Sequence, residues 1–197
     1  QTIQVDDSAD STSIAQFVEY YEDASELLEI EDILASNLDV SFIPHDNDRM
    51  HFGITSSAYW VRFNLDWSAS NGTTTKILEF GPPKHVPGII RGGIDIYVID
   101  EAGNLSFNYR LGSLGNAREI KTLNRGFALR VDPDFGEQVY FRITSARPLR
   151  LPITLWNENS FRQTEMRANS NLGLQYGILF AMIFYNLFLY FSIRESS

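Results

Sequence analysis

Apolar and polar residues alternate in the stretch SSAYWVRFNLDW, Ser56 to Trp67. The members of one side are apolar: Tyr59, Val61, Phe63, Leu65 and Trp67. The members of the other side are mostly polar: Trp60, Arg62, Asn64 and Asp66. A period of two is typical of a strand with one buried face. We therefore predict a strand whose first side faces the core. Alternation alone leaves open whether its second side is solvated surface or the floor of a binding site.

The same alternation marks six further segments, 75–81, 93–100, 105–112, 126–132, 138–145 and 149–156. Turn signals rich in Gly, Pro and Asn separate them, and Asp100–Asn104 is typical of a hairpin loop. At least seven short strands without intervening helices predict a mainly β fold, an antiparallel jelly-roll β-sandwich over residues 16–157.

The remaining segments are expected to differ from this pattern. The polar residues 1–15 are interpreted as a flexible leader, and Phe17–Asp23 as a short strand. The apolar spacing in Leu27–Ser36 predicts a short amphipathic helix. Asn157–Asn171 lacks Gly and Pro, so we predict a helical coupling segment over 158–171, capped by Asn159 or Ser160. A flexible linker is the alternative.

An uncharged run, Leu172 to Ile193, follows directly. About 20 apolar residues are needed to cross the hydrocarbon core of a bilayer as a helix. The sequence therefore predicts a transmembrane helix over 172–193, against the alternative of a buried helix in a soluble domain. The chain is expected to be a truncated receptor whose remaining segments would follow this span.

Composition narrows the possible functions. The formal net charge of −9 argues against nucleic acid as a partner, because phosphate binding relies on clustered Lys and Arg. The chain has no cysteine, which excludes disulfides, thiol catalysis and Cys-ligated zinc. Recognised catalytic motifs are missing from the sequence, and we expect neither an enzyme nor a cofactor. Weak metal signals at His45–His51 and Asp132–Glu137 are better explained as a loop and a turn, so no metal site is predicted.

The outward positions of several strands combine an aromatic residue with an arginine. Aromatic rings offer an apolar face to a sugar or planar ligand, and guanidinium groups clamp carboxylates. We therefore interpret one set as candidate ligand-binding residues: Trp60, Arg62, Tyr140, Arg142, Arg150 and Trp156. Alternatively, the arginines pair with nearby carboxylates, for example Arg62 with Asp66 or Glu79. Because a sandwich has two outer faces, the six need not share one.

A long loop provides a competing site. Gly81–Gly93 is rich in Gly and Pro and carries Lys84, His85 and Arg91. Such a loop can present cations and backbone N–H groups to a ligand. The alternative is a connection between two sheets.

The order of several motifs resembles a known family. These motifs are EYYED, FGITSSAYWVRFNL, DIYVID, LRLPITLW, FRQTE and the apolar run LGLQYGILFAMIFYNLFLYFSI. Together they resemble the periplasmic type-2 sensor domain of bacterial seven-transmembrane receptors with diverse intracellular signalling modules. The resemblance implies a fold like that of carbohydrate-binding modules, with residues 1–170 in the periplasm and 172–193 as the first helix in the inner membrane. It implies a cytoplasmic output module that is absent from this chain.

Two functional hypotheses follow. In the first, the domain binds a carbohydrate or small acidic ligand and transmits the signal through the membrane helices. In the second, it is a protein-interaction module that controls receptor assembly without a small ligand. Expected partners are the ligand, the lipid bilayer through 172–193 and a second copy in a homodimer.

Overall fold

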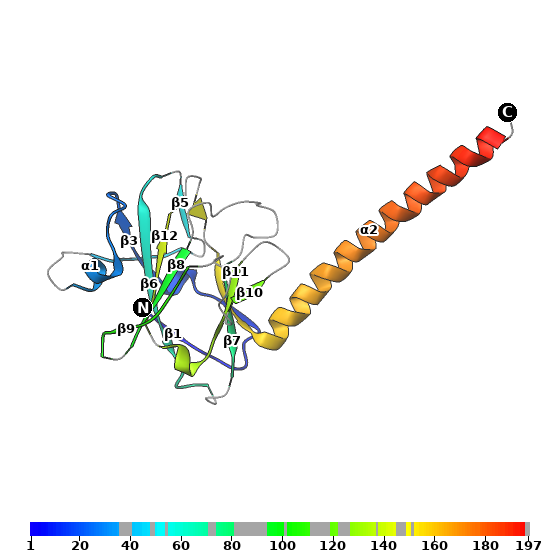
Figure 1. The fold of residues 1–197 in the computed structure, drawn as a ribbon. Coiled ribbons are helices and arrows are strands. Elements are labelled where there is room, and N and C mark those ends of the chain that lie inside the picture. Colours follow the sequence, from blue (N-terminus) through cyan, green and yellow to red (C-terminus); the bar gives the residue numbers. More distant parts are fainter. Residues whose placement is uncertain are drawn as a thin grey trace. The chain divides into compact units, whose positions relative to one another are not determined.

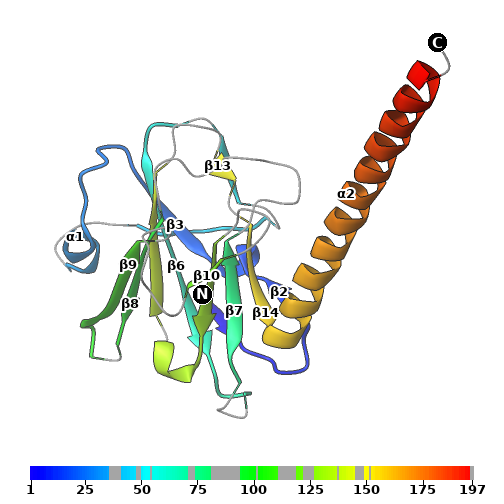
Figure 2. The same ribbon diagram turned by 45° about the vertical axis from the view of Figure 1, so that its right-hand side comes forward.

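The computed structural model describes residues 1–35, 41–47, 50–53, 55–70, 74–80, 94–100, 102–110, 119–121, 127–136, 138–144, 149–150 and 152–195. The chain divides into two compact units, Gln1–Ser160 and Phe161–Ser197. The first unit is built from strands, as Figures 1 and 2 show.

Among the described residues, the strands form a seven-stranded, a five-stranded and a two-stranded sheet. The first has the order β4 (Ile43–Pro44), β3 (Glu19–Asp23), β6 (Ala58–Asp66), β12 (Gln138–Ile143), β8 (Ile94–Ile99) and β9 (Leu105–Arg110), with β1 (Thr2–Gln4) also beside β6. The second has the order β10 (Glu119–Lys121), β11 (Phe127–Val131), β7 (Lys76–Phe80), β14 (Ile153–Asn157) and β2 (Ser11–Ser13). The third pairs β13 (Leu149–Arg150) with β5 (His51–Gly53).

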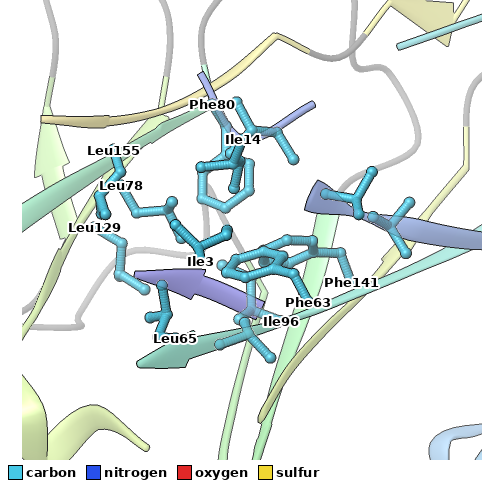
Figure 3. Close-up of a cluster of buried hydrophobic side chains, with 14 of the residues drawn as sticks. Ile3, Ile14, Phe63, Leu65, Leu78, Phe80, Ile96, Leu129, Phe141 and Leu155 are labelled. Carbon is cyan, nitrogen blue, oxygen red and sulfur yellow. The ribbon is translucent and has the colours of Figure 1, made fainter. Parts of the chain in front are cut away.

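The two larger sheets enclose one apolar core between them. Phe63 and Phe141 enter it from the seven-stranded sheet, and Leu78, Phe80 and Leu129 enter it from the five-stranded sheet (Figure 3). The Phe80 and Phe141 rings meet edge to face across the interior, with centroids 4.9 Å apart. Apart from the parallel pair of β1 with β6, the described pairings are antiparallel. The predicted mainly β, antiparallel sandwich is therefore confirmed.

Residues 1–15 differ from the expected flexible leader. β1 pairs with β6, and β2 pairs with β14 in the other sheet. Ile3, Val5 and Ile14 are buried in the central core. The polar residues between these apolar positions hide the pattern, and two three-residue strands are too short for periodicity to reveal.

One other local prediction is confirmed, and a second is correct in type but not in length. The hairpin loop at Asp100–Asn104 is confirmed: the Asp100 backbone N–H donates to the Asn104 carbonyl, and Gly103 has a φ of 82°. The predicted helix over 27–36 is shorter, because α1 covers only Ile30–Leu34. It begins with a capping box between Glu29 and Asp32.

One continuous helix, α2 (Glu158–Glu195), follows β14. The Asn157 side-chain oxygen accepts the Asn159 backbone N–H at 3.1 Å, so Asn157 caps this helix in place of Asn159 or Ser160. Residues Glu158–Ile193 are long and apolar enough to cross a membrane, and no other helix among the described residues is. The predicted span, 172–193, lies within this helix and stays a prediction.

The burial of Ile3 gives a stability prediction. We expect Ile3→Ala to lower the free energy of unfolding by about 2–5 kcal/mol, because it leaves a cavity in the core. Gln4→Ala, at the exposed neighbouring position, is the control and should change it by less than about 0.5 kcal/mol. Urea unfolding followed by circular dichroism measures both. Equal, small effects of the two substitutions would restore the interpretation of a flexible leader.

Candidate functional site

The second face of β6 is largely covered by protein. Trp60 is fully buried, and its ring stacks on Tyr97 with centroids 5.7 Å apart. These rings belong to a second apolar cluster, which Ile30 and Ile33 of α1 complete. The alternation separates the two faces of β6 correctly. The interpretation of Trp60 as a ligand-facing residue is not supported, because its side chain is buried. Sequence periodicity separates two faces of a strand, and it does not say which other segment covers each face.

Arg142 lies in the same covered region. It is directly opposite Trp60 on β6, and its Nη2 donates to the Glu26 carbonyl oxygen at 2.6 Å. Glu26 has a positive φ of 59°, in a turn whose N–H groups donate to the buried Asp23 carboxylate. Arg142 therefore braces the turn before α1, which is a structural role.

A depression opens on the same sheet beyond this covered region. It has a volume of about 260 Å³. The residues that line it are Gln1, Glu19, Arg62, Asn64, Gln138 and Tyr140. Two of the predicted ligand-binding residues, Arg62 and Tyr140, are among them, and they lie directly opposite each other on β6 and β12.

The depression lies where one edge of β6 changes partner. Residues 58–62 of β6 pair with β3, whereas residues 64–66 pair with β1. Glu19 is the first residue of β3 and lies opposite Arg62. Just past the change, the Asn64 backbone N–H donates to the Gln1 carbonyl oxygen at 2.9 Å. The side chains of Arg62 and Asn64, two positions apart on one strand, therefore flank this change of partner.

The Arg62 guanidinium is held from two directions. Its Nε donates to Glu19 Oε2 at 2.7 Å, and its Cζ lies 4.1 Å from the centroid of the Phe42 ring. Neither Asp66 nor Glu79 is this partner, contrary to the alternatives considered from the sequence. Burial raises the pKa of Glu19, but the hydrogen bonds and charges of Arg62 and of the Gln1 amino group outweigh burial, so the pKa stays below its ordinary value.

The other two predicted residues lie elsewhere. Trp156 is on β14 of the five-stranded sheet, and its Nε1 donates to Glu79 Oε2 at 2.8 Å. Arg150 is on β13, which pairs with β5, and its side chain lies outside the described part of the chain. The six residues therefore do not form one surface. The competing loop, Gly81–Gly93, also lies outside the described residues.

The weak metal signals gain no geometric support. His45 is buried, and its Nδ1 lies 3.0 Å from the Ala15 carbonyl oxygen. Asp134 lies in a short turn of 3-10 helix, Pro133–Phe135. Asp48 and Glu137 are outside the described residues. Within the described ranges, no three His, Asp or Glu side chains are grouped as metal ligands would be.

Sequence reasoning missed four residues of the depression, including Gln1, which belonged to the segment interpreted as a flexible leader. Asn64 and Gln138 form a cross-strand pair and have the same phase as Arg62 and Tyr140, so the alternation contained a signal for both. Glu19 carried no such signal, since its role depends on the register of β3 against β6.

The Glu19–Arg62 ion pair gives a pH prediction. Because the folded pKa of Glu19 is lowered, its stabilising effect is present above the unfolded pKa of about 4.3 and is lost as the pH falls through the folded pKa. We expect Glu19→Gln to destabilise the domain at pH 7 and to cost progressively less below pH ~4. Denaturant unfolding at several pH values measures this. Glu31→Gln on α1 is the control, and a pH-independent cost of Glu19→Gln would contradict the assignment.

Comparisons with known proteins identify the family. Residues 15–157 match the family described as 7TMR-DISM extracellular 2. Two solved structures of fucose binding modules from Streptococcus pneumoniae are similar at a low level. One is 12% identical, with 56% of this chain and 71% of that chain covered and a TM-score of 0.32. The second, SpX-3, is 14% identical, with 74% and 97% covered and a TM-score of 0.35. No curated protein matches the sequence. Since the family match spans most of the chain, this protein belongs to the 7TMR-DISM extracellular 2 family, the extracellular sensor domains of 7TMR-DISM receptors.

Proposed function

We propose that this chain is the ligand-binding part of a membrane receptor, and that the depression at Arg62 binds a small neutral carbohydrate. The observation that carries this proposal is the lining itself: two amides, a phenol and a paired carboxylate and guanidinium around about 260 Å³. Pockets for drug-sized ligands usually have about 300–1,000 Å³, so this one suits a single sugar unit or the end of a glycan.

The hydrogen-bonding groups favour a polyhydroxylated ligand. The Asn64 and Gln138 amides each offer both donors and acceptors, and the Tyr140 hydroxyl offers one of each. Sugar hydroxyls likewise donate and accept, so they can satisfy such a mixed set of groups. Of these groups, Tyr140 is buried, Asn64 is partly buried and Gln138 is exposed, so a ligand could reach the two amides from solvent.

Charge favours a neutral ligand over the acidic ligand that the sequence also suggested. The Arg62 guanidinium is already bonded to Glu19 Oε2 at 2.7 Å, and the Gln1 amino group lies 3.3 Å from Glu19 Oε1, so both cations of the lining are already paired with this carboxylate. A carboxylate ligand would approach the Glu19 carboxylate and would have to compete with it for Arg62. A neutral sugar has neither cost, and it can still bond to the remaining N–H groups of Arg62 and to the lone pairs of Glu19.

The proposal places this domain outside a bacterial inner membrane, in the periplasm, with α2 as the start of the membrane part. Binding can change the output only if the ligand favours one of two arrangements of the receptor. We propose that the change passes along α2 toward the further membrane helices and a cytoplasmic output module. The expected homodimer stays a prediction. Large apolar side chains are exposed in the first unit at Phe17, Leu27, Ile43 and Leu105, but isolated exposed residues of this kind are common.

A binding screen tests the carbohydrate proposal. Residues 1–197 in detergent micelles would be titrated by calorimetry with methyl glycosides of neutral hexoses, deoxyhexoses, N-acetylhexosamines and uronic acids. We expect binding of at least one neutral glycoside, and we expect Asn64→Ala to weaken it about tenfold through the loss of one or two hydrogen bonds. Asn108→Ala, an exposed position on β9 outside the depression, is the matched control.

Two results would contradict the proposal. The first is that none of the neutral glycosides binds at millimolar concentration. The second is that a glycoside binds equally well to Asn64→Ala and to the unchanged chain. Tighter binding of uronic acids than of the neutral hexosides would favour the small acidic ligand instead.

A further inference from the structure

One short segment runs from the depression to the first turn of α2. We call Gln1–Ser13 the N-terminal strap. Its first part, β1, belongs to the seven-stranded sheet, and its last part, β2, belongs to the five-stranded sheet beside β14. The strap therefore crosses from the sheet that carries the depression to the sheet that leads into α2.

The depression end of the strap is fixed to β6. Gln1 lines the depression, and its carbonyl oxygen accepts the backbone N–H of Asn64, another lining residue. Thr2 is paired with Asn64, and the Val5 N–H donates to the Asp66 carbonyl at 2.8 Å. A ligand that displaces Asn64 must also displace the strap or break these bonds.

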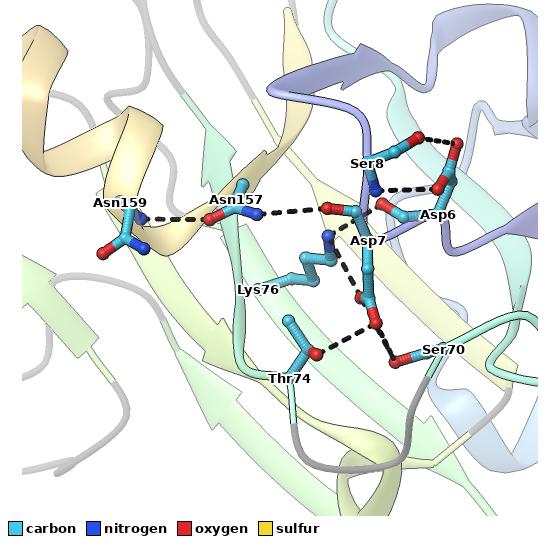
Figure 4. Close-up of polar contacts among 8 residues, drawn as sticks. All are labelled: Asp6, Asp7, Ser8, Ser70, Thr74, Lys76, Asn157 and Asn159. Carbon is cyan, nitrogen blue, oxygen red and sulfur yellow. Dashed lines mark hydrogen bonds and ion pairs between the residues drawn. The ribbon is translucent and has the colours of Figure 1, made fainter.

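The middle of the strap is fixed by a buried cation. Lys76, at the start of β7, is 2% exposed, and its Nζ donates to the Asp6 carbonyl oxygen at 2.8 Å (Figure 4). The same Nζ lies 3.5 Å from Asp7 Oδ1, and the Asp7 carboxylate also accepts from the Ser70 and Thr74 hydroxyls. Because an unpaired buried ammonium is very costly, Lys76 keeps the strap in one register against β7.

The far end of the strap holds the beginning of α2. The Asn157 side-chain amide donates to the Asp7 carbonyl at 3.4 Å, and its backbone N–H donates to the Asp10 carbonyl at 2.9 Å. Ser160 Oγ donates to Asp10 Oδ1 at 2.6 Å. Asn157 is also the residue whose side chain caps α2, so the strap contacts the group that fixes where the helix begins.

We propose that the N-terminal strap is the mechanical link between the depression and α2, and that the Lys76–Asp7 pair makes it move as one unit. A shift of Asn64 then displaces β1, and the displacement reaches Asn157 and Ser160 through Asp6, Asp7 and Asp10. This inference rests on the proposed function for one point only, the ligand that would move Asn64. The coupling itself is a property of the chain without ligand.

Amide hydrogen exchange of residues 1–197 in detergent micelles tests this coupling. The double variant Asp7→Asn, Lys76→Met removes both charges without leaving either buried alone. We expect exchange at the Val5, Asn64 and Asn157 amides to accelerate together, on the order of tenfold, because loss of the charged bonds lets the whole strap open. The control pair is Asp95→Asn, Arg110→Met, which removes an ion pair of β8 and β9. It should leave these three amides unchanged.

A second variant perturbs only the far end. Ser160→Ala removes the bond to Asp10 at a partly buried position, and it should accelerate exchange at Val5 as well as at Asn157. If the double variant unfolds globally, Ser160→Ala still tests whether the two ends of the strap are coupled. Acceleration at Asn157 with Val5 and Asn64 unchanged would overturn the proposal, as would no change at any of the three amides. Because no ligand is used, neither result bears on the carbohydrate proposal, which is tested separately by the binding screen.

Discussion

The position of β6 at the centre of the seven-stranded sheet constrains everything else in this domain. Val61, Phe63 and Leu65 of its inner face lie in the main core, whereas Trp60 of its outer face lies in a second core under α1. A strand buried on both faces and paired along both edges has little freedom to shift. Side chains at its few open positions, Arg62 and Asn64, are therefore held in a fixed geometry, as a binding site requires.

The depression and the strap are two consequences of one topological feature. The edge of β6 is shared between an antiparallel neighbour, β3, and a parallel one, β1. The change of neighbour leaves room for the depression, and it also makes the strap part of the depression's rim. The buried Lys76 then ties this rim to the opposite sheet, where Asn157 begins α2. The strap thus contributes Gln1 to the depression and also contacts Asn157, the residue that caps α2.

The sequence revealed the strands well and the site only in part. Long alternating segments such as residues 58–66 and 138–143 can be recognised as strands from the sequence, because one buried face imposes a period of two. The burial of Trp60 could not be predicted in this way, since α1 is only five residues long and covers a face that alternation marks as outward. Glu19 could be placed only with the register of β3, and β1 was hidden because Ile3 is its one buried residue. Trp156 is aromatic like Trp60 but lies on the other sheet. The order of the strands decides which sheet a residue joins, and alternation does not reveal that order.

A ligand that binds at Arg62 and Asn64 should be sensed at Asn157 through the strap. The most direct measurement is backbone amide NMR of residues 1–197 in micelles, titrated with the tightest-binding methyl glycoside. We expect chemical-shift changes at Asn64 and Gln138, with smaller changes that follow the same saturation curve at Val5, Asp10 and Asn157. Changes centred on Trp156 and Glu79 of the five-stranded sheet, with Asn64 and Val5 unaffected, would contradict this expectation.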